Sequence, residues 1–394
     1  MRFGIAYGAD AVYMAGTRFG MRAAATNFDD NALREGIAYA HAHGVKCYIT
    51  VNIMPSNRDL PALPAYLELL QDAGADAMIV ADVGVIRMAQ KYAPKVPLHI
   101  STQTSILNPE AANFWADMGA ERVVLARELS LEEIAEIRAK TPKSLEIEAF
   151  VHGAMCISYS GRCLISQYMT GRDANHGACA QPCRWNYSLM EEKRPGQFFP
   201  VEEDGRGTYL YNSKDMCMIE HVPELIEAGI TSFKIEGRNK TAYYAACVTG
   251  AYRAAIDTYK KDPENFVLPQ FCRDEVNKVS HREYYTGFYF GNQENGQHYG
   301  DSQYIREYEV VGMPVECDDS GKAVFALKNR FFDGEELELI QPGQAPYVFR
   351  AENVTDDEGT KRELFNVPQM RVHFAFPFKV SEWAILRKVK ERPE

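Results

Sequence analysis

Four cysteines lie close together in the middle of the chain, within the segment HGAMCISYSGRCLISQYMTGRDANHGACAQPCRW. Six residues separate Cys156 from Cys163, fifteen separate Cys163 from Cys179, and three separate Cys179 from Cys183. Thiolates at such short spacings can converge on one soft metal centre, because closing a short loop costs little conformational entropy. We therefore interpret the four cysteines as metal ligands rather than as packing residues.

Two kinds of metal centre are compatible with these cysteines. Structural zinc prefers cysteine pairs separated by about two to four residues, which suits Cys179 and Cys183 better than Cys156 and Cys163. A [4Fe–4S] cluster needs four thiolates and accepts varied spacings, so we favour it over zinc. Buried cysteines without a metal are the third interpretation. Cys217 is a reserve ligand, although its apolar neighbours in DMCMI are more typical of a core position.

Polar residues recur where short apolar runs stop, and each such position is a candidate site residue. In a barrel of parallel strands, the carboxyl ends of the strands carry the active site. His152 is the candidate acid–base group, because an imidazole ordinarily titrates near neutrality. We expect Gln103, Glu236 and Arg238 to be polar groups of the same pocket. The strand-end residues are Asn52, Asp82, Gln103, Arg127, His152 and Glu236.

Basic and aromatic residues interleave with the cysteines, a pattern that can serve a nucleic-acid ligand. Trp185 can stack on a base, and Arg162 and Arg184 can contact phosphates. The alternative is that the aromatic residues only pack around a metal centre. Lys234 or Arg238, in KIEGR, can bind a carboxylate, or this segment forms a structural cluster of salt bridges.

The first 240 residues or so alternate short apolar runs with amphipathic stretches, which predicts an α/β fold with parallel strands. We count seven strands, whereas a (β/α) barrel has eight. MRFGIAYG reads as the tail of a helix with no strand before it, so we expect a TIM-like barrel that lacks its first strand. An open, doubly wound sheet is the alternative. The predicted strands are Asp10–Gly16, Cys47–Asn52, Ala77–Asp82, Leu98–Gln103, Arg122–Arg127, Glu146–Gly153 and Ser232–Gly237.

Helix signals and a change of pattern complete this organisation. Helices are expected over Asp30–His43 and Leu60–Gly74, and Ser130 with Glu133 forms a capping box. The barrel domain is expected over 1–300, with a cysteine-rich insertion over about 154–231. Residues 301–394 alternate apolar and polar positions between DDSG and FDGE turns, which predicts a small antiparallel β domain.

Composition limits the function classes. The 394-residue chain has a formal net charge of −11 and 46% hydrophobic residues, which is ordinary for a globular protein. No apolar run is long enough for a membrane span, and the N-terminus lacks a secretory signal, so we expect a cytoplasmic protein. The acidic charge excludes a wholly basic nucleic-acid coat protein, but not a local basic cleft.

Several long motifs resemble the peptidase U32 family, also called collagenase-like proteases. EAFVHGAMCISYSGRCLIS resembles the family signature, and GADAVYMAG, ISTQTSILN, HGACAQPCRWNY, NSKDM and FKIEGRNK resemble further family blocks in the same order. Relatives begin with a strand of the type ELLAPAG, which this chain lacks. The C-terminal β region resembles an accessory domain of one branch of the family.

The resemblance implies an oxygen-independent hydroxylase that carries a [4Fe–4S] cluster. One branch acts on the wobble uridine of tRNA and uses prephenate, and the small β domain favours this branch. Family patterns place cluster ligands at Cys156, Cys163 and Cys179, with Cys183 as our choice for the fourth and Cys217 as the fallback. Lys234 or Arg238 would then bind the prephenate-like donor.

Three functional hypotheses follow. The first is a tRNA-hydroxylating iron–sulfur enzyme whose barrel mouth holds the base beneath the cysteine loop, with a homologous partner subunit as a further expectation. The second is a peptidase, as the family name says, although the sequence has no G-x-S-x-G or HExxH motif. The third is a metal-stabilised RNA-binding module without catalysis.

Overall fold

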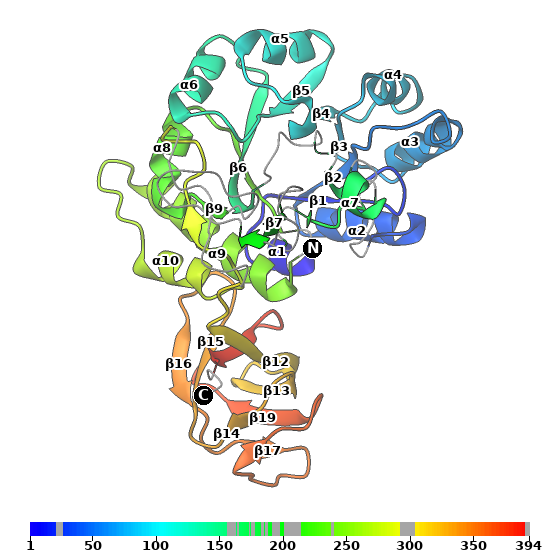
Figure 1. Cartoon of the computed structure of the whole chain (residues 1–394). Helices are drawn as coiled ribbons and strands as arrows, with labels where there is room; N and C mark the ends of the chain where they lie inside the picture. The colour runs from blue at the N-terminus through cyan, green and yellow to red at the C-terminus, as the bar shows by residue number, and fades with distance from the viewer. Residues whose placement is uncertain are drawn as a thin grey trace. The chain divides into compact units, whose positions relative to one another are not determined.

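A computed structural model of the chain describes residues 1–20, 27–155, 163, 165–172, 174, 178–182, 185, 188–190, 198–200, 214–237, 240–291 and 304–390. The chain divides into two units (Figure 1). The sheet unit comprises Asp10–Asn239 and Arg282–Gln303. The C-terminal unit comprises Met1–Ala9, Lys240–His281 and Tyr304–Glu394. The predicted domain boundary near residue 300 stays a prediction.

The sheet unit contains parallel strands at all seven predicted places. Each strand from β1 to β6 pairs with the next along the chain, and β10 pairs with β6. This order has no reversal, so the sheet lacks the switch point of a doubly wound fold. The strands are β1 (Ala11–Met14), β2 (Lys46–Val51), β3 (Ala77–Val80), β4 (Leu98–Ile100), β5 (Ala120–Val124), β6 (Glu146–Ala154) and β10 (Ser232–Ile235).

Side chains connect β1 to β10, the first and last of these parallel strands. The Tyr13 hydroxyl donates a hydrogen bond to Glu236 Oε2 over 3.1 Å, and Lys234 Nζ lies 4.5 Å from the centre of the Tyr13 ring. Within the described residues, β1 and β10 form no backbone ladder with each other. The α/β fold with a parallel sheet is confirmed, whereas closure into a barrel stays a prediction.

The helices of the sheet unit turn apolar faces towards the strands. Helix α3 (Leu63–Asp72) buries Leu63, Tyr66, Leu67 and Leu70, which share one face at helical spacing. Figure 1 shows α3, α4, α5 and α6 outside the strands. The predicted capping box of Ser130 and Glu133 is confirmed at the start of α6. The remaining helices are α2 (Asp30–Ala42), α4 (Val83–Tyr92), α5 (Pro109–Asp117), α6 (Leu131–Ala139), α7 (Ile165–Thr170) and α8 (Val222–Glu227).

Two short strands extend the sheet beyond β6. The end of β6 pairs antiparallel with β9 (Asp215–Cys217), and β11 (Tyr284–Tyr285) pairs parallel with β9. Gly153 permits this crowding, since its φ is +111° and an added Cβ would lie 2.5 Å from the Glu236 carbonyl oxygen. The minor elements are the antiparallel pair β7 (Ser188–Met190) and β8 (Phe198–Pro200), and the short helices Leu60–Ala62, Thr102–Thr104 and Ile219–His221.

The C-terminal unit combines a helix from the N-terminus and helices from residues 240–281 with a β domain. The predicted N-terminal helix is confirmed as α1 (Arg2–Ala6), and Gly8 follows it with φ +98°. Helix α1 packs on α9 (Ala242–Lys261), and the Tyr7 hydroxyl donates to the Trp383 carbonyl oxygen over 3.0 Å. Helix α10 (Gln270–Asn277) also packs on α9.

The predicted antiparallel β domain is confirmed. One seven-stranded sheet has the order β16-β15-β20-β12-β13-β19-β17, and β14 pairs with β18. Phenylalanines dominate its core, where the Phe331 and Phe365 rings stack 4.8 Å apart. The strands are β12 (Tyr308–Cys317), β13 (Lys322–Leu327), β14 (Phe331–Phe332), β15 (Glu336–Ile340), β16 (Tyr347–Arg350), β17 (Thr355–Asp356), β18 (Leu364–Phe365), β19 (Arg371–Ala375) and β20 (Ile385–Val389).

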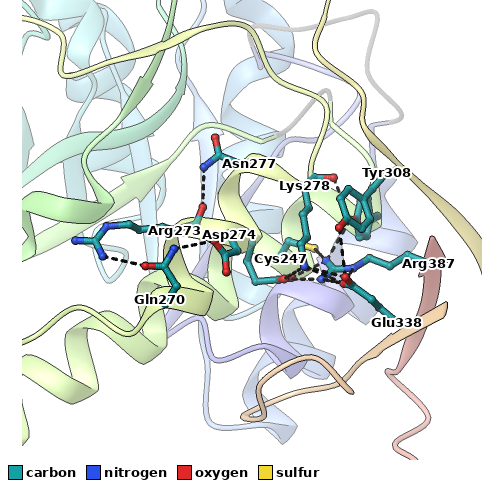
Figure 2. Close-up of polar contacts among 11 residues, drawn as sticks. Cys247, Gln270, Arg273, Asp274, Asn277, Lys278, Tyr308, Glu338 and Arg387 are labelled. Atoms are coloured by element: carbon teal, nitrogen blue, oxygen red, sulfur yellow. Dashed lines mark hydrogen bonds and ion pairs between the residues drawn. The ribbon is translucent and has the colours of Figure 1, made fainter. Parts of the chain in front are cut away.

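A buried ionic cluster ties the helices to the sheet within this unit (Figure 2). The Arg387 side chain on β20 is fully buried and contacts both Glu275 carboxylate oxygens, one of them over 2.6 Å. Arg387 also donates to Glu338 Oε2, and Lys278 Nζ donates to Glu338 over 2.9 Å. The Arg387 guanidinium donates to the Tyr243 hydroxyl over 3.2 Å. One cation therefore joins α9, α10, β15 and β20.

In the part of the chain that the structure describes, no helix is both long enough and apolar enough to cross a membrane.

Candidate active site at the carboxyl edge of the parallel sheet

The predicted acid–base residue His152 and the predicted pocket residue Glu236 lie at the carboxyl edge of β6 and β10. The Glu236 backbone N–H donates to the His152 carbonyl oxygen over 2.9 Å. His152 is 1% exposed and Glu236 is 9% exposed, so both side chains are shielded from bulk water. The structure therefore brings a buried imidazole and a buried carboxyl group to one edge of the sheet.

Two tyrosines contact these groups. The Tyr284 hydroxyl on β11 lies 3.3 Å from His152 Nε2, and the two ring centres are 5.2 Å apart. The Tyr13 hydroxyl on β1 donates to Glu236, as described above. Neither tyrosine was a predicted site residue. Tyr284 lies 132 residues from His152 on a two-residue strand, so no local pattern could have identified it.

Gln103 is fixed by its neighbours at the same edge. It lies in the short helix after β4, and its Oε1 accepts hydrogen bonds from Asn52 Nδ2 over 2.6 Å and from Ser101 Oγ over 3.0 Å. These two donors orient the amide, because Oε1 is the acceptor end of the group. The strand-end residue Asp82 instead caps helix α4, accepting from the Val85 N–H over 3.0 Å.

Lys234 lies among buried charges on the strands below this edge. Its Nζ contacts Glu148 Oε1 over 2.5 Å, and Arg122 contacts Glu148 Oε2 over 2.8 Å. Burial opposes ionisation of Glu148, but the two cations outweigh it and lower the pKa of Glu148 to about 2. A substrate carboxylate would have to compete with Glu148 for Lys234. The predicted carboxylate-binding role of Lys234 stays a prediction.

His99 adds a second titrating group to this buried layer. It lies on β4 at 6% exposure, with its ring 4.6 Å from the Tyr48 ring. Burial, and next the Arg122 cation, lower the pKa of His99 to about 3. The folded protein therefore holds His99 neutral at every pH above that value.

We expect the free energy of unfolding to fall as the pH drops below about 6.5. Histidine in the unfolded chain takes up a proton near pH 6.5, whereas folded His99 does so only near pH 3, so protons favour the unfolded state between these values. The slope is about 1.4 kcal/mol per pH unit for one group. Below about pH 4.5, protonation of Glu148 in the unfolded chain adds a slope of the same sign.

Urea unfolding of the wild type and of His99→Asn at pH 7.5, 6.5, 5.5 and 4.5 measures this effect. The variant should have a shallower pH dependence between pH 6.5 and 4.5. Parallel curves for the two proteins would contradict the assignment of this slope to His99.

The structure describes three of the five candidate ligand cysteines. Cys163 is half-buried and Cys179 is exposed, and the Gln181 N–H donates to Cys179 Sγ over 3.3 Å. Cys217 on β9 lies opposite His152 on β6, so their side chains share one face of the sheet. Cys156 and Cys183 lie outside the described residues. Among the described residues, no three His, Cys, Asp or Glu side chains are grouped so that they could hold a metal ion.

Of the residues predicted to contact RNA, the structure describes Trp185. Trp185 is 44% exposed. Arg162, Arg184 and Arg238 lie outside the described residues, so the structure does not place them.

The strand order, the polar carboxyl edge and the separate antiparallel domain define an α/β protein with an accessory β domain. The model of peptidase family U32 matches residues 1–299, and the model of the U32 C-terminal domain matches residues 306–387. The chain belongs to the peptidase U32 family. This confirms the resemblance that the cysteine-containing signature indicated.

Three relatives have names that refer to RNA. The chain is 38% identical over 392 residues to the tRNA hydroxylation protein P1 of Bacillus subtilis, covering 99% of this chain and 92% of that protein. It is 37% identical to the tRNA hydroxylation protein P of Escherichia coli, and the match covers 91% of this chain and 87% of that protein. It is 38% identical to the 23S rRNA 5-hydroxycytidine synthase of Escherichia coli, covering 80% of this chain and 46% of that protein.

Proposed function

We propose that this chain is an RNA hydroxylase that adds the hydroxyl group to C5 of the wobble uridine of tRNA. The observation that carries the proposal is its similarity, over nearly its whole length, to two proteins named for tRNA hydroxylation. tRNA is then the substrate, and the cytoplasm is the site of the reaction. The 23S rRNA relative supports the broader class of pyrimidine hydroxylation in RNA.

The base would bind at the carboxyl edge of a barrel that closes between β1 and β10. The side-chain bridge from Tyr13 to Glu236 supports this closure. A wobble base in an anticodon loop is already unstacked, so little unstacking energy opposes its entry. His152 would hold and move a proton at Nε2, with Glu236 and Gln103 orienting the base. Buried acid–base groups of this kind also keep water away from the reacting atoms.

A [4Fe–4S] cluster would be held by Cys156, Cys163 and Cys179, with Cys183 or Cys217 as the fourth ligand. When bound, such a cluster supplies one-electron chemistry. The N–H···S bond to Cys179 supports a thiolate ligand, because such bonds stabilise the negative sulfur. Zinc is the alternative metal. A prephenate-like acid is the proposed donor of the hydroxyl group.

Deletion of the gene should remove 5-hydroxyuridine derivatives from the wobble position of tRNA. Expression of the wild-type chain should restore them, and Cys163→Ala should not, because a cluster that loses a thiolate ligand is lost or inactive. Mass spectrometry of tRNA nucleosides measures the result, with Cys317→Ala, at an exposed β-domain cysteine, as the matched control. An unchanged nucleoside profile on deletion would reject the proposed function.

Serine variants of the two candidate fourth ligands should differ in iron content. If Cys217 is the ligand, its place opposite His152 sets the cluster beside the acid–base group, and Cys217→Ser loses iron while Cys183→Ser keeps it. If Cys183 is the ligand, the order reverses. Iron and sulfide analysis of protein purified without air distinguishes these two cases. A wild-type iron content in both variants would contradict this ligand set.

Peptidase activity is the second candidate. The family name and the cross-strand neighbours Cys217 and His152 favour it, because a thiol beside an imidazole can act as a nucleophile. Casein cleavage that survives Cys163→Ala but not Cys217→Ala would support the peptidase and reject the cluster-dependent reaction.

A further inference from the structure

We infer that Arg127 is the anion-binding residue of this site, and that it takes an oxyanion of the substrate or donor. The inference rests on the proposed function for the identity of the ligand, but not for the existence of the site. The ligand chemistry is a planar carboxylate or a phosphate, which a guanidinium binds through two parallel hydrogen bonds.

Arg127 lies at the carboxyl edge of the parallel sheet, three residues after β5. Its guanidinium carbon lies 3.9 Å from the centre of the Phe150 ring on β6, two residues before His152. The same ring has Lys234 Nζ at 5.7 Å. Stacking on Phe150 fixes the plane of the guanidinium, which prepares it for a planar ligand.

Within the described part of the chain, the buried Nε of the Arg127 guanidinium lacks a hydrogen-bond partner. No carboxylate of the described residues lies at ion-pairing distance from Arg127. Burial raises the pKa of the neighbouring Glu128, and the nearby Arg127 cation opposes this rise. A half-buried cation with unused donors binds an anion readily, since its desolvation cost is already present in the free protein.

The contrast with Lys234 shows which cation is available. Lys234 pairs with Glu148, and Arg122 pairs with both Glu148 and Glu146, so their charges are neutralised within the sheet. Among the described residues, the Arg127 guanidinium lies over the Phe150 ring, and its charge acts on Glu128, on Tyr285 of β11 and on Tyr289. The Arg127 cation opposes the burial that raises the pKa of Tyr285 to about 12, which places its charge near β11. Of the three cations Lys234, Arg122 and Arg127, Arg127 is therefore the one without a carboxylate at ion-pairing distance among the described residues.

Binding measurements on the full-length protein test this assignment without turnover. Prephenate, inorganic phosphate and tRNA serve as probes, by calorimetry for the small anions and filter binding for tRNA. We expect Arg127→Gln to lower the affinity for one of these probes about 10- to 100-fold, because the substitution removes two charge-assisted hydrogen bonds. Arg127→Lys should weaken the same probe about 3- to 10-fold, since it keeps the charge but loses the planar fork. Arg87→Gln, at an exposed position on α4, is the matched control and should bind like the wild type.

The probe that is lost identifies the source of the oxyanion. Loss of prephenate binding with normal tRNA affinity assigns a donor carboxylate. Loss of tRNA affinity, with the salt slope reduced by about one unit, assigns an RNA phosphate. The inference is overturned if Arg127→Lys binds all three probes with the wild-type affinities and Arg127→Gln does the same. The Arg127→Gln result counts when this variant keeps the wild-type unfolding midpoint. A wild-type nucleoside profile in the deletion strain would reject the proposed function but leave these binding results standing.

Discussion

Arg387→Met should lower the free energy of unfolding of the C-terminal unit by about 3–5 kcal/mol. The substitution leaves the buried Glu275 carboxylate and the partly buried Glu338 carboxylate without their main cation. Lys278 lies 2.9 Å from Glu338 but 3.6 Å from Glu275, so it can compensate only one of them well. An uncompensated charge in a low-dielectric interior accounts for most of the expected loss.

Two variants separate lost charge from lost packing. Arg371→Met removes an arginine from β19 whose ion pairs with Glu316 and Asp357 are exposed, and it should change stability little. Replacing Arg387, Glu275, Glu338 and Lys278 together by Met, Leu, Leu and Met should recover most of the stability, because the resulting apolar cluster has no unpaired charge. Urea unfolding followed by circular dichroism gives the comparison. Equal losses for Arg387→Met and Arg371→Met would contradict the role of burial.

The parallel sheet was predictable because its signal is local. Each strand is a short apolar run, and each helix repeats its apolar residues at helical spacing, as Leu63, Leu67 and Leu70 do on α3. Strand ends were predictable for the same reason, which is why His152 and Glu236 were identified together. Asp82 shows the limit of this signal, since a polar residue after a strand can simply cap the next helix.

The partners of the site residues were not predictable from sequence. Tyr13, Tyr284 and Glu148 reach Glu236, His152 and Lys234 across 223, 132 and 86 positions of the chain. No periodicity encodes such pairings, because they depend on which strands become neighbours. The same gap explains why the sequence allows Lys234 either an anion-binding role or a place in a structural cluster of salt bridges. The partner of Lys234, Glu148, is visible only once β10 is paired with β6.

The helices α9 and α10 show a comparable limit. The fact that they pack with the β domain depends on single long-range contacts. Arg387 on β20 reaches Tyr243 and Glu275 across 144 and 112 positions. The change of sequence pattern near residue 300, from which the domain boundary was predicted, contains no information about those contacts.

His152→Asn should lower the rate of RNA hydroxylation by about 10²- to 10⁴-fold. Asparagine keeps a polar group of similar size but cannot take up or release a proton near neutral pH. The position is 1% exposed, so bulk water cannot readily replace the imidazole as the proton carrier. tRNA affinity should stay within about threefold of the wild type, because the backbone carbonyl that binds Glu236 remains and phosphate contacts provide most of the affinity.

Two matched variants make this result interpretable. Tyr284→Phe keeps the imidazole but removes the hydroxyl 3.3 Å from Nε2, so it should lower the rate less than His152→Asn does. His43→Asn alters an exposed histidine at the end of α2 and should leave the rate unchanged. Single-turnover reactions with saturating tRNA, analysed by nucleoside mass spectrometry, separate chemistry from binding. If His152→Asn reacted at the wild-type rate, His152 would be a structural histidine, and the proton-carrying role would pass to Glu236, the other buried acid–base group of this edge.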